Sequence, residues 1–195
     1  MTTDGVSPPE FALNAINLAS AGLGARPVFA TDEFFAPLER LLQDAPPVYH
    51  PGVYDENGKW MDGWETRRRR GPGNDHAIIA LAANGRIQGF EVDTAHFTGN
   101  YPSACAIDAC LAPGEPNEET VWTELVCPRP LGPSALHHFE AKSDAVWSHV
   151  RLRIYPDGGI ARLKVYGTPA LDPTVIGDTV VDLASSLLGG RIIIY

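Results

Sequence analysis

The sequence predicts an all-β protein, a jelly-roll β-sandwich with short peripheral helices. Past residue 76 the chain consists mainly of short apolar or alternating segments separated by turns rich in glycine and proline, a pattern typical of sandwiches. The segments with helical character are short and precede residue 48. A chain of 195 residues is long enough to bury the core of one such domain.

The N-terminal quarter is expected to supply the helices. Residues 1–15 are interpreted as a flexible leader, and an apolar stretch over 12–23 predicts a modest helix. A short strand is predicted over 27–30. Thr31-Asp32 is a suitable N-cap for a second helix, which would end near a Pro-Pro pair and carry Phe34, Phe35, Leu38, Leu41 and Leu42. The stretch 49–57, rich in Pro, Gly and Asp, predicts a loop.

The middle of the chain predicts strands. Residues 77–82 form a continuous apolar run, which indicates a strand buried on both faces. The Asn-Gly pair at 84–85 predicts a hairpin turn into a second strand over 86–94. Alternation along this second strand puts Phe90 and Asp93 on opposite faces.

Further strands are predicted toward the C-terminus. Residues 103–111 predict another strand and 120–126 a short one. The clearest hairpin is expected over 149–167, where two alternating segments flank a Pro-Asp-Gly-Gly turn at 156–159.

Composition limits the classes of partner. The 24 acidic residues outnumber 15 basic ones, giving a net charge of −9, which argues against nucleic acid or an anionic membrane as the main partner. Three cysteines, Cys105, Cys110 and Cys127, fit a reducing compartment without a disulfide framework. We find neither an apolar run of membrane-spanning length nor an export signal, so we expect a cytoplasmic protein.

The two ends of the chain resemble each other. Residues 17–26 (NLASAGLGAR) are echoed 165 residues later by residues 182–191 (DLASSLLGGR). Self-similarity at the spacing of a domain suggests duplication. We therefore expect a linker over 171–181 and the start of a second, truncated repeat over 182–195. Coincidence in a segment rich in Leu, Ala and Gly is the alternative.

Four long segments resemble the allantoicase (allantoate amidinohydrolase) family, and they lie in the same order, at residues 28–37, 58–70, 89–100 and 149–167. The resemblance covers most of residues 16–170. It implies two tandem jelly-roll repeats of galactose-binding-like topology, of which residues 16–170 would be the first. It also implies cleavage of allantoate to ureidoglycolate and urea, in purine breakdown. A non-catalytic binding module for small ligands and an inactive truncated allantoicase are the alternatives, and we expect a homo-oligomer.

Charged and polar side chains gather beside the predicted strand ends in two of these segments. Burying such groups without a partner costs several kcal/mol, so their concentration predicts a site. The residues assigned to catalysis are Asp93, His96 and Glu65. Those assigned to substrate binding are Arg67, Arg68, Arg69, Asn100, Asp62 and Trp60.

Allantoate is a small anion with one carboxylate and two ureido groups, so its site needs a cation and a proton donor. In the predicted mechanism an arginine of the 67–70 run binds the carboxylate. His96 or Glu65 protonates the departing urea nitrogen, and Asp93 orients or activates a water molecule at the central carbon.

Each assignment has a structural alternative. The arginines could be solvated or paired with Asp62 and Glu65, the tryptophans could be packing, and the loop after Asp93 could be held by Asx-type bonds. His137, His138 and Glu140 have the spacing of metal ligands, but adjacent residues of a strand point to opposite sides. No metal ligand is therefore assigned. The resemblance leaves a divalent ion such as Mn²⁺ open, because some allantoicases are described as metal-dependent.

Overall fold

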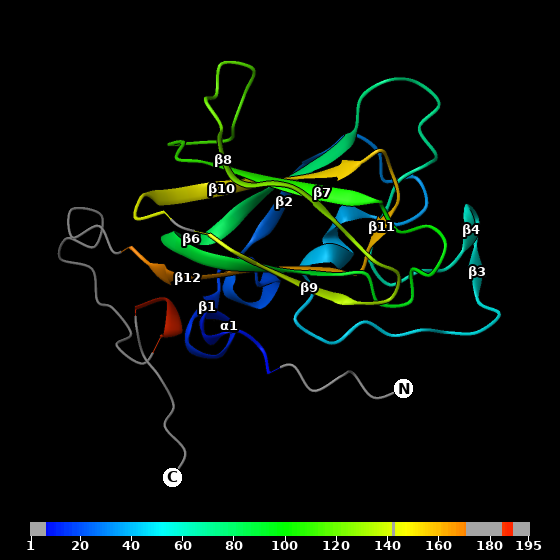
Figure 1. The fold of residues 1–195 in the computed structure, drawn as a ribbon, viewed down its shortest axis with the longest axis horizontal. Coiled ribbons are helices and arrows are strands. Elements are labelled where there is room, and N and C mark those ends of the chain that lie inside the picture. The colour runs from blue at the N-terminus through cyan, green and yellow to red at the C-terminus, as the bar shows by residue number, and fades with distance from the viewer. Residues whose placement is uncertain (1–6, 142, 171–184, 189–195) are drawn as a thin grey trace, which may run out of the picture.

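The computed structural model describes residues 7–141, 143–170 and 185–188, and it is a sandwich of two β-layers (Figure 1). Three predicted segments lie wholly or partly outside the described residues: the first part of the leader, the linker and the start of a second repeat. In the last of these, only residues 185–188, which include a short 3-10 helix, are described. Within the described part of the chain, no helix is long and apolar enough to cross a membrane. The helical elements are α1 (Glu10–Asn14), η1 (Ala21–Leu23), η2 (Leu38–Leu42) and η3 (Ser186–Leu188).

The strands are short except for one. They are β1 (Ile16–Asn17), β2 (Arg26–Ala30), β3 (Tyr54–Asp55), β4 (Gly58–Lys59), β5 (Trp64–Glu65), β6 (Asp75–Asp93), β7 (Ala104–Cys110), β8 (Thr123–Pro130), β9 (Leu136–Glu140), β10 (Val146–Tyr155), β11 (Gly159–Ile160) and β12 (Arg162–Pro169). The all-β sandwich prediction is confirmed, as are the individual predictions of strands at β2 and β7.

Strand β6 belongs to both layers. Its first part, residues 75–80, pairs with β2 on one side and β10 on the other, and β10 continues to β7 and β8. Its last part, residues 89–93, pairs with β12 and β9. Strands that pass from one sheet to the other form the corners of a sandwich.

The hairpin predicted at 84–85 is wrong, because β6 continues through this point as one strand of 19 residues. Gly85 is instead a place of close approach. A Cβ on Gly85 would lie 2.7 Å from Leu18 Cδ1 and 2.9 Å from the Thr168 carbonyl oxygen. The Asn-Gly pair therefore marks the crossing between layers, where a glycine is needed for space rather than for a turn.

The hairpin predicted over 149–167 is also wrong as a strand pair. Strand β10 pairs with β6 and β7, whereas β12 pairs with β6 and β1, so the two strands lie in opposite layers. Alternation correctly identified both strands, but it specifies which face is buried and not which strand is the partner. The turn between them is present, and Gly158 has a φ of +136° that favours glycine.

The predicted helices are shorter than expected. The stretch 12–23 divides into the end of α1, the strand β1 and the single turn η1, and the second helix is only η2. Asp32 does not cap η2. Its side chain accepts a hydrogen bond from the amide of Phe34 at 2.9 Å, which forms a local Asx turn. The predicted loop over 49–57 contains β3, which pairs with β4 in a small hairpin.

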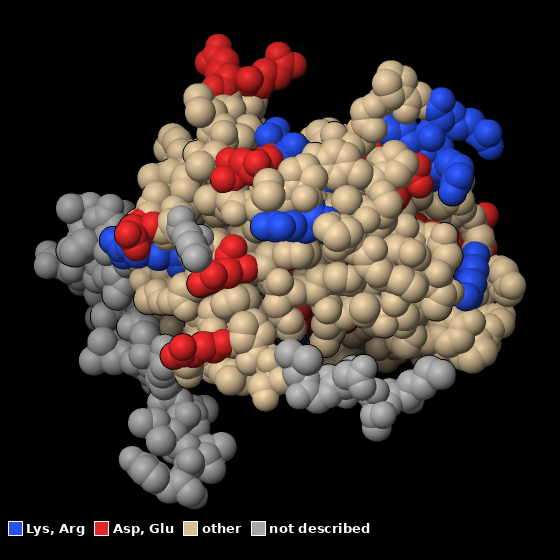
Figure 2. Space-filling model, in the orientation of Figure 1, with Lys and Arg blue, Asp and Glu red and all other residues tan. Residues whose placement is uncertain are grey.

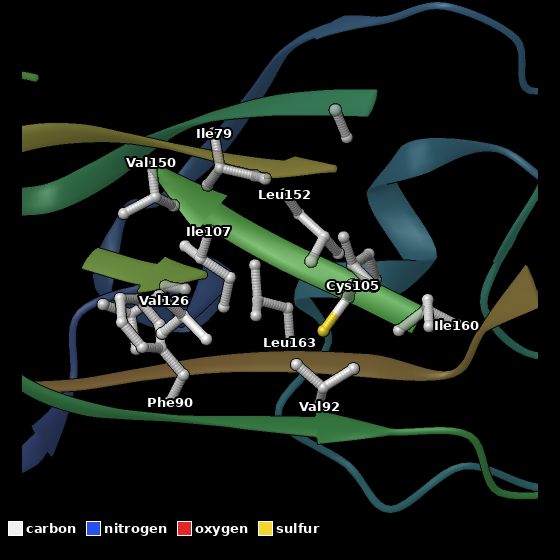
Figure 3. Packing of buried hydrophobic residues seen from close by; sticks show 14 of the residues in the cluster. Ile79, Phe90, Val92, Cys105, Ile107, Val126, Val150, Leu152, Ile160 and Leu163 are labelled. Atoms are coloured by element: carbon white, nitrogen blue, oxygen red, sulfur yellow. The ribbon is translucent and has the colours of Figure 1, made fainter. Parts of the chain in front are cut away.

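The core lies between the layers. Apolar residues of β7 and β10 pack toward those of β6 and β12 (Figure 3). Fully buried members include Ile107, Leu152, Phe90, Val92 and Leu163. Each such side chain contributes roughly 1.5–3 kcal/mol of transfer free energy. This core holds the ends of β6 and β12 and the short strands β5 and β11 in fixed relative positions.

Candidate functional site

The predicted site residues lie at the end of the sandwich where β5 pairs with β11. Trp64 anchors this end because its side chain is fully buried and its indole Nε1 donates a hydrogen bond of 2.9 Å to the carbonyl of Asp32. The next residue, Glu65, is paired through its backbone with Gly159. The loop that follows β6 approaches the same place, since the amide of Gly159 donates to the carbonyl of Asn100 at 2.7 Å.

Glu65 and Asn100 form a direct pair. Asn100 Nδ2 donates to Glu65 Oε1 at 2.6 Å, and Glu65 is only 8% exposed. Burial raises the pKa of Glu65 above its usual 4.5, and the negative charge of Asp55 raises it further. The hydrogen bond from Asn100 and the positive charge of Lys59 lower this pKa, but by less than burial raises it. A buried carboxyl of this kind holds its proton at a higher pH than an exposed one.

His96 lies on the same loop as Asn100 and has a left-handed backbone with φ of +68°. This conformation is uncommon for residues other than glycine and is found at functional sites. Its Nε2 lies 3.2 Å from the carbonyl of Pro47, and its ring stacks on Tyr49 with centroids 5.7 Å apart. The Lys59 ammonium lies 4.6 Å from the centroid of the Tyr49 ring.

Two sets of contacts from four segments lie here, Glu65 with Asn100 and Tyr49 with Lys59 and His96, and the charge of Lys59 acts on Glu65. We call the two sets together the Glu65 cluster, and its members are Tyr49, Lys59, Glu65, His96 and Asn100. It brings together three residues predicted from the sequence. Tyr49 and Lys59 were not predicted from the sequence, because a tyrosine beside a Pro-rich loop and a lysine in a tight turn carry no distinctive local signal.

Asp93 is buried beside this group, but its contacts are with other residues. Its Oδ1 accepts a hydrogen bond of 2.7 Å from the amide of Ala95, which is the Asx-type bond weighed as the structural alternative. Burial raises the pKa of Asp93, the Ala95 amide lowers it, and the neighbouring Glu91 raises it further. Asp93, His96 and Asn100 were predicted as one polar set, but the structure gives each of them separate partners.

Asp62 belongs to a buried ion pair. Arg162 Nη2 lies 2.8 Å from Asp62 Oδ2, and the two side chains are 2% and 6% exposed respectively. Burial alone would raise the pKa of Asp62, but the hydrogen bonds from Arg162 and from the amide of Val48 hold it below its usual value. The sequence suggested a partner in the 67–70 run, whereas the partner is an arginine 100 residues away.

Arg162 fixes the segment that leads to Tyr49. Its guanidinium donates to the carbonyls of Arg40 and Ala45 at 3.2 and 3.0 Å and to those of Ala161 and Asp62. Asp62 completes the connection by accepting from the amide of Val48 at 2.8 Å. The pair therefore fixes the backbone of Val48, the residue before Tyr49 of the Glu65 cluster.

The four consecutive arginines form an exposed loop after β5, which we call the arginine loop (residues 67–70). Its side chains project as the blue group at the upper right of Figure 2. Arg67 pairs with Asp32 at 2.8 Å and Arg69 with Asp75 at 2.7 Å, while Arg68 and Arg70 have no ion pair with any described residue. A cavity of about 440 Å³ is lined by this loop together with Thr31, Asp32 and Asp75.

Trp60 is half-buried and packs against two other side chains. The Arg40 guanidinium lies 5.0 Å from its ring centroid and the His50 ring lies 5.1 Å away. These contacts support the packing interpretation, since both faces of an aromatic ring are attractive to cations and to other rings.

The residues with metal-ligand spacing do not fit a metal. His137 Nδ1 lies 3.1 Å from the carbonyl oxygen of Val92, and His137 Nε2 accepts a hydrogen bond from the amide of Gly132. His138 Nε2 lies 3.1 Å from Glu91 Oε2. In the described part of the chain, no group of three or more His, Cys, Asp or Glu side chains is placed to hold an ion. Burial raises the pKa of Cys105 to about 12 and that of Cys110 to about 11, which suits inert core residues.

Gly63 gives a first test of how this end is packed. A Cβ at this position would overlap the carbonyl of Ile160 and lie 2.7 Å from Ala161 Cα. We expect Gly63→Ala to lower the free energy of unfolding by about 1–3 kcal/mol, because backbone cannot move aside as a side chain can. Urea denaturation checks this, with Gly71→Ala as the control, since nothing lies within 4 Å of a Cβ there. Equal effects of the two substitutions would contradict this description of the packing.

The buried carboxyl of Glu65 predicts a pH-dependent cost to stability. Its pKa is higher in the folded than in the unfolded protein, so the folded state binds more protons above the usual pKa of 4.5 and loses stability as pH rises. Glu65→Gln removes this cost. We expect melting temperatures between pH 4 and 8 to show the variant gaining on the native protein as pH rises, until it is the more stable at pH 7. Glu39→Gln, on an exposed turn, should show no such trend. A variant that loses stability at pH 7 would contradict the assignment.

Comparison with known proteins shows the family of this chain. The family described as "Allantoicase repeat" matches residues 16–170. A relative from Rhizobium meliloti named "Probable allantoicase" is 65% identical over 195 residues, which are 100% of this chain and 57% of that protein. A relative of the same name from Pseudomonas fluorescens is 49% identical over 178 residues, covering 90% and 54% of the two chains. The chain thus spans about half the length of the curated relatives it matches.

Solved structures show the same relationship. The crystal structure of allantoicase from Saccharomyces cerevisiae superposes with a TM-score of 0.74 at 33% identity, covering 89% of this chain and 52% of that one. A family 32 CBM from C. perfringens in complex with galactose superposes with a TM-score of 0.52 at 13% identity, covering 77% and 98%. The second likeness shows the galactose-binding-like fold alone.

Proposed function

Because the chain belongs to the allantoicase family, we propose that, joined to a second repeat, it forms a hydrolase that cleaves allantoate to ureidoglycolate and urea in purine degradation. Residues 16–170 would be the first repeat, 171–181 a linker and 182–195 the start of the second. The family match over 16–170, the relatives of about twice the length and the sequence echo after 165 residues support this division.

The observation that carries the proposal is the Glu65–Asn100 pair. Urea leaves a carbon atom readily only when its nitrogen takes up a proton as the bond breaks. A buried carboxyl whose pKa is raised, held in one orientation by an amide at 2.6 Å, suits the role of proton donor. His96 in the same cluster is the alternative donor.

The reaction consumes one water molecule. The hydroxyl of the water forms a bond to the central carbon, the bond from that carbon to one ureido nitrogen breaks, and the leaving nitrogen gains a proton to give urea. In our proposal Glu65 supplies this proton and is then restored by the proton that the water gives up. Asp93, whose pKa is also raised by burial, would orient the water.

Two further expectations from the sequence belong to this proposal, a cytoplasmic location and assembly into a homo-oligomer. Among the described strands, β8 pairs with β7 alone and β9 with β6 alone. Edge strands of this kind offer surfaces for association, which supports the second expectation.

A non-catalytic binding module is the competing function. The fold supports it, but a module that only binds needs no buried carboxyl with a raised pKa. The test offers allantoate and galactose to the purified protein, with and without Mn²⁺. Urea released from allantoate would support the hydrolase. Galactose binding by calorimetry, without urea release from a folded protein joined to its second repeat, would favour the module.

A further inference from the structure

The proposed substrate carries a carboxylate, and its site therefore needs a cation close to the proton donor. Near this end of the sandwich the described residues include two exposed sources of positive charge, the arginine loop and Lys59. Their surroundings differ in ways that decide between them.

The arginine loop is held by acids outside the Glu65 cluster. Arg67 is held by Asp32 and Arg69 by Asp75, so the loop is tied to the segment after β2 and to the start of β6. The cavity beside it is lined by those two acids and includes no member of the Glu65 cluster. Its positive charge is thus partly neutralised already.

Lys59 lies inside the Glu65 cluster. Its ammonium is held 4.6 Å from the Tyr49 ring, and that ring stacks on His96. Lys59 makes no ion pair with any described residue. Its partner across the β3–β4 turn is the uncharged Tyr54. Asp55, next along β3, pairs with Gly58, and its Oδ1 accepts from the amides of Asn57 and Gly58 at 3.0 and 3.1 Å.

Lys59 is also the cation that acts on the proton donor. Among the charges that affect the pKa of Glu65, Lys59 lowers it and Asp55 raises it, and no arginine contributes. An unpaired ammonium supported by an aromatic face retains most of its attraction for an anion, because a cation–π contact does not neutralise the charge. A lysine ammonium is a compact point charge on a flexible stem, which suits a monodentate contact with a small carboxylate.

We infer that Lys59 binds the carboxylate of the substrate and that Tyr49 holds the ammonium in place, so that this pair makes the site specific for an anionic ureide. The inference rests on the proposed function and deepens it. It replaces the arginine loop, which the sequence favoured, as the anchor of the carboxylate.

The test measures urea release by this chain completed with the C-terminal portion of the Rhizobium meliloti relative. We expect Lys59→Met to raise KM for allantoate roughly 10- to 100-fold, the worth of one charged hydrogen bond, with little change in kcat. That pattern indicates the loss of binding energy common to the ground state and transition state. Lys59→Arg should restore most of the affinity. Arg129→Met, at an exposed arginine that belongs to neither the Glu65 cluster nor the arginine loop, is the charge-matched control and should behave as the native protein.

A second readout separates charge from shape. The carboxamide of allantoate, which lacks the negative charge, should inhibit the native protein and the Lys59→Met variant equally. An unchanged KM in Lys59→Met would overturn the inference, and a raised KM in Arg68→Met would then return the role to the arginine loop. Absence of urea release by the native, folded protein would instead overturn the proposed function, so the two failures are distinguishable.

Discussion

Replacing Glu65 by Gln in the completed protein is expected to lower kcat for allantoate by roughly 10²–10⁴-fold, the range that a positioned acid supplies. Glutamine keeps the shape of the side chain and can still accept the hydrogen bond from Asn100, which is 2.6 Å long in the native protein. It cannot donate a carboxyl proton. The same substitution is expected to stabilise the fold at neutral pH, so unfolding would not explain the loss of activity.

The pH profile of this activity gives a sharper readout. The acid must be protonated to act, so the rate of the native protein should fall as pH rises through the raised pKa of Glu65. The Gln variant should retain a low rate without this decline. Glu39→Gln is the matched control because Glu39 is an exposed acid on η2. A Gln variant with native kcat would transfer the role of donor to His96.

The second large effect is expected at the buried ion pair. Arg162→Met leaves the Asp62 carboxylate in the interior without its partner and removes the donors of four carbonyl contacts. Removing one partner of a buried pair costs roughly 3–5 kcal/mol, and we expect a loss of that size in the free energy of unfolding, measured with urea.

Arg26→Met serves as the control for this substitution. Arg26 forms an ion pair of similar length with Glu115, 2.9 Å, but the two side chains are 53% and 61% exposed. Exposed pairs contribute about 0–1 kcal/mol because water and salt screen them. Similar losses for the two variants would show that burial does not determine the strength of the Asp62–Arg162 pair.

The sequence predicted the faces of strands better than their partners. In β7 and β10 every second side chain faces the core, so the sequence pattern that follows this alternation predicted both strands. The partner of a strand depends on residues far along the chain. This is why 149–167 looked like a hairpin, and why the Asn-Gly pair in β6 looked like a turn although β6 crosses between layers there.

The same limit applies to the site. Glu65, His96 and Asn100 were predicted because charged and polar groups beside strand ends stand out locally. Arg162 was missed because its partner Asp62 lies 100 residues away, and Lys59 because only the fold brings it over Tyr49 and near Glu65.

The most direct measurement is the urea and ureidoglycolate formed from allantoate by this chain completed with its second repeat. The proposal predicts equal amounts of the two products, released at a rate that depends on Glu65. A completed protein that folds, as judged by circular dichroism and a cooperative melt, and forms neither product would contradict it.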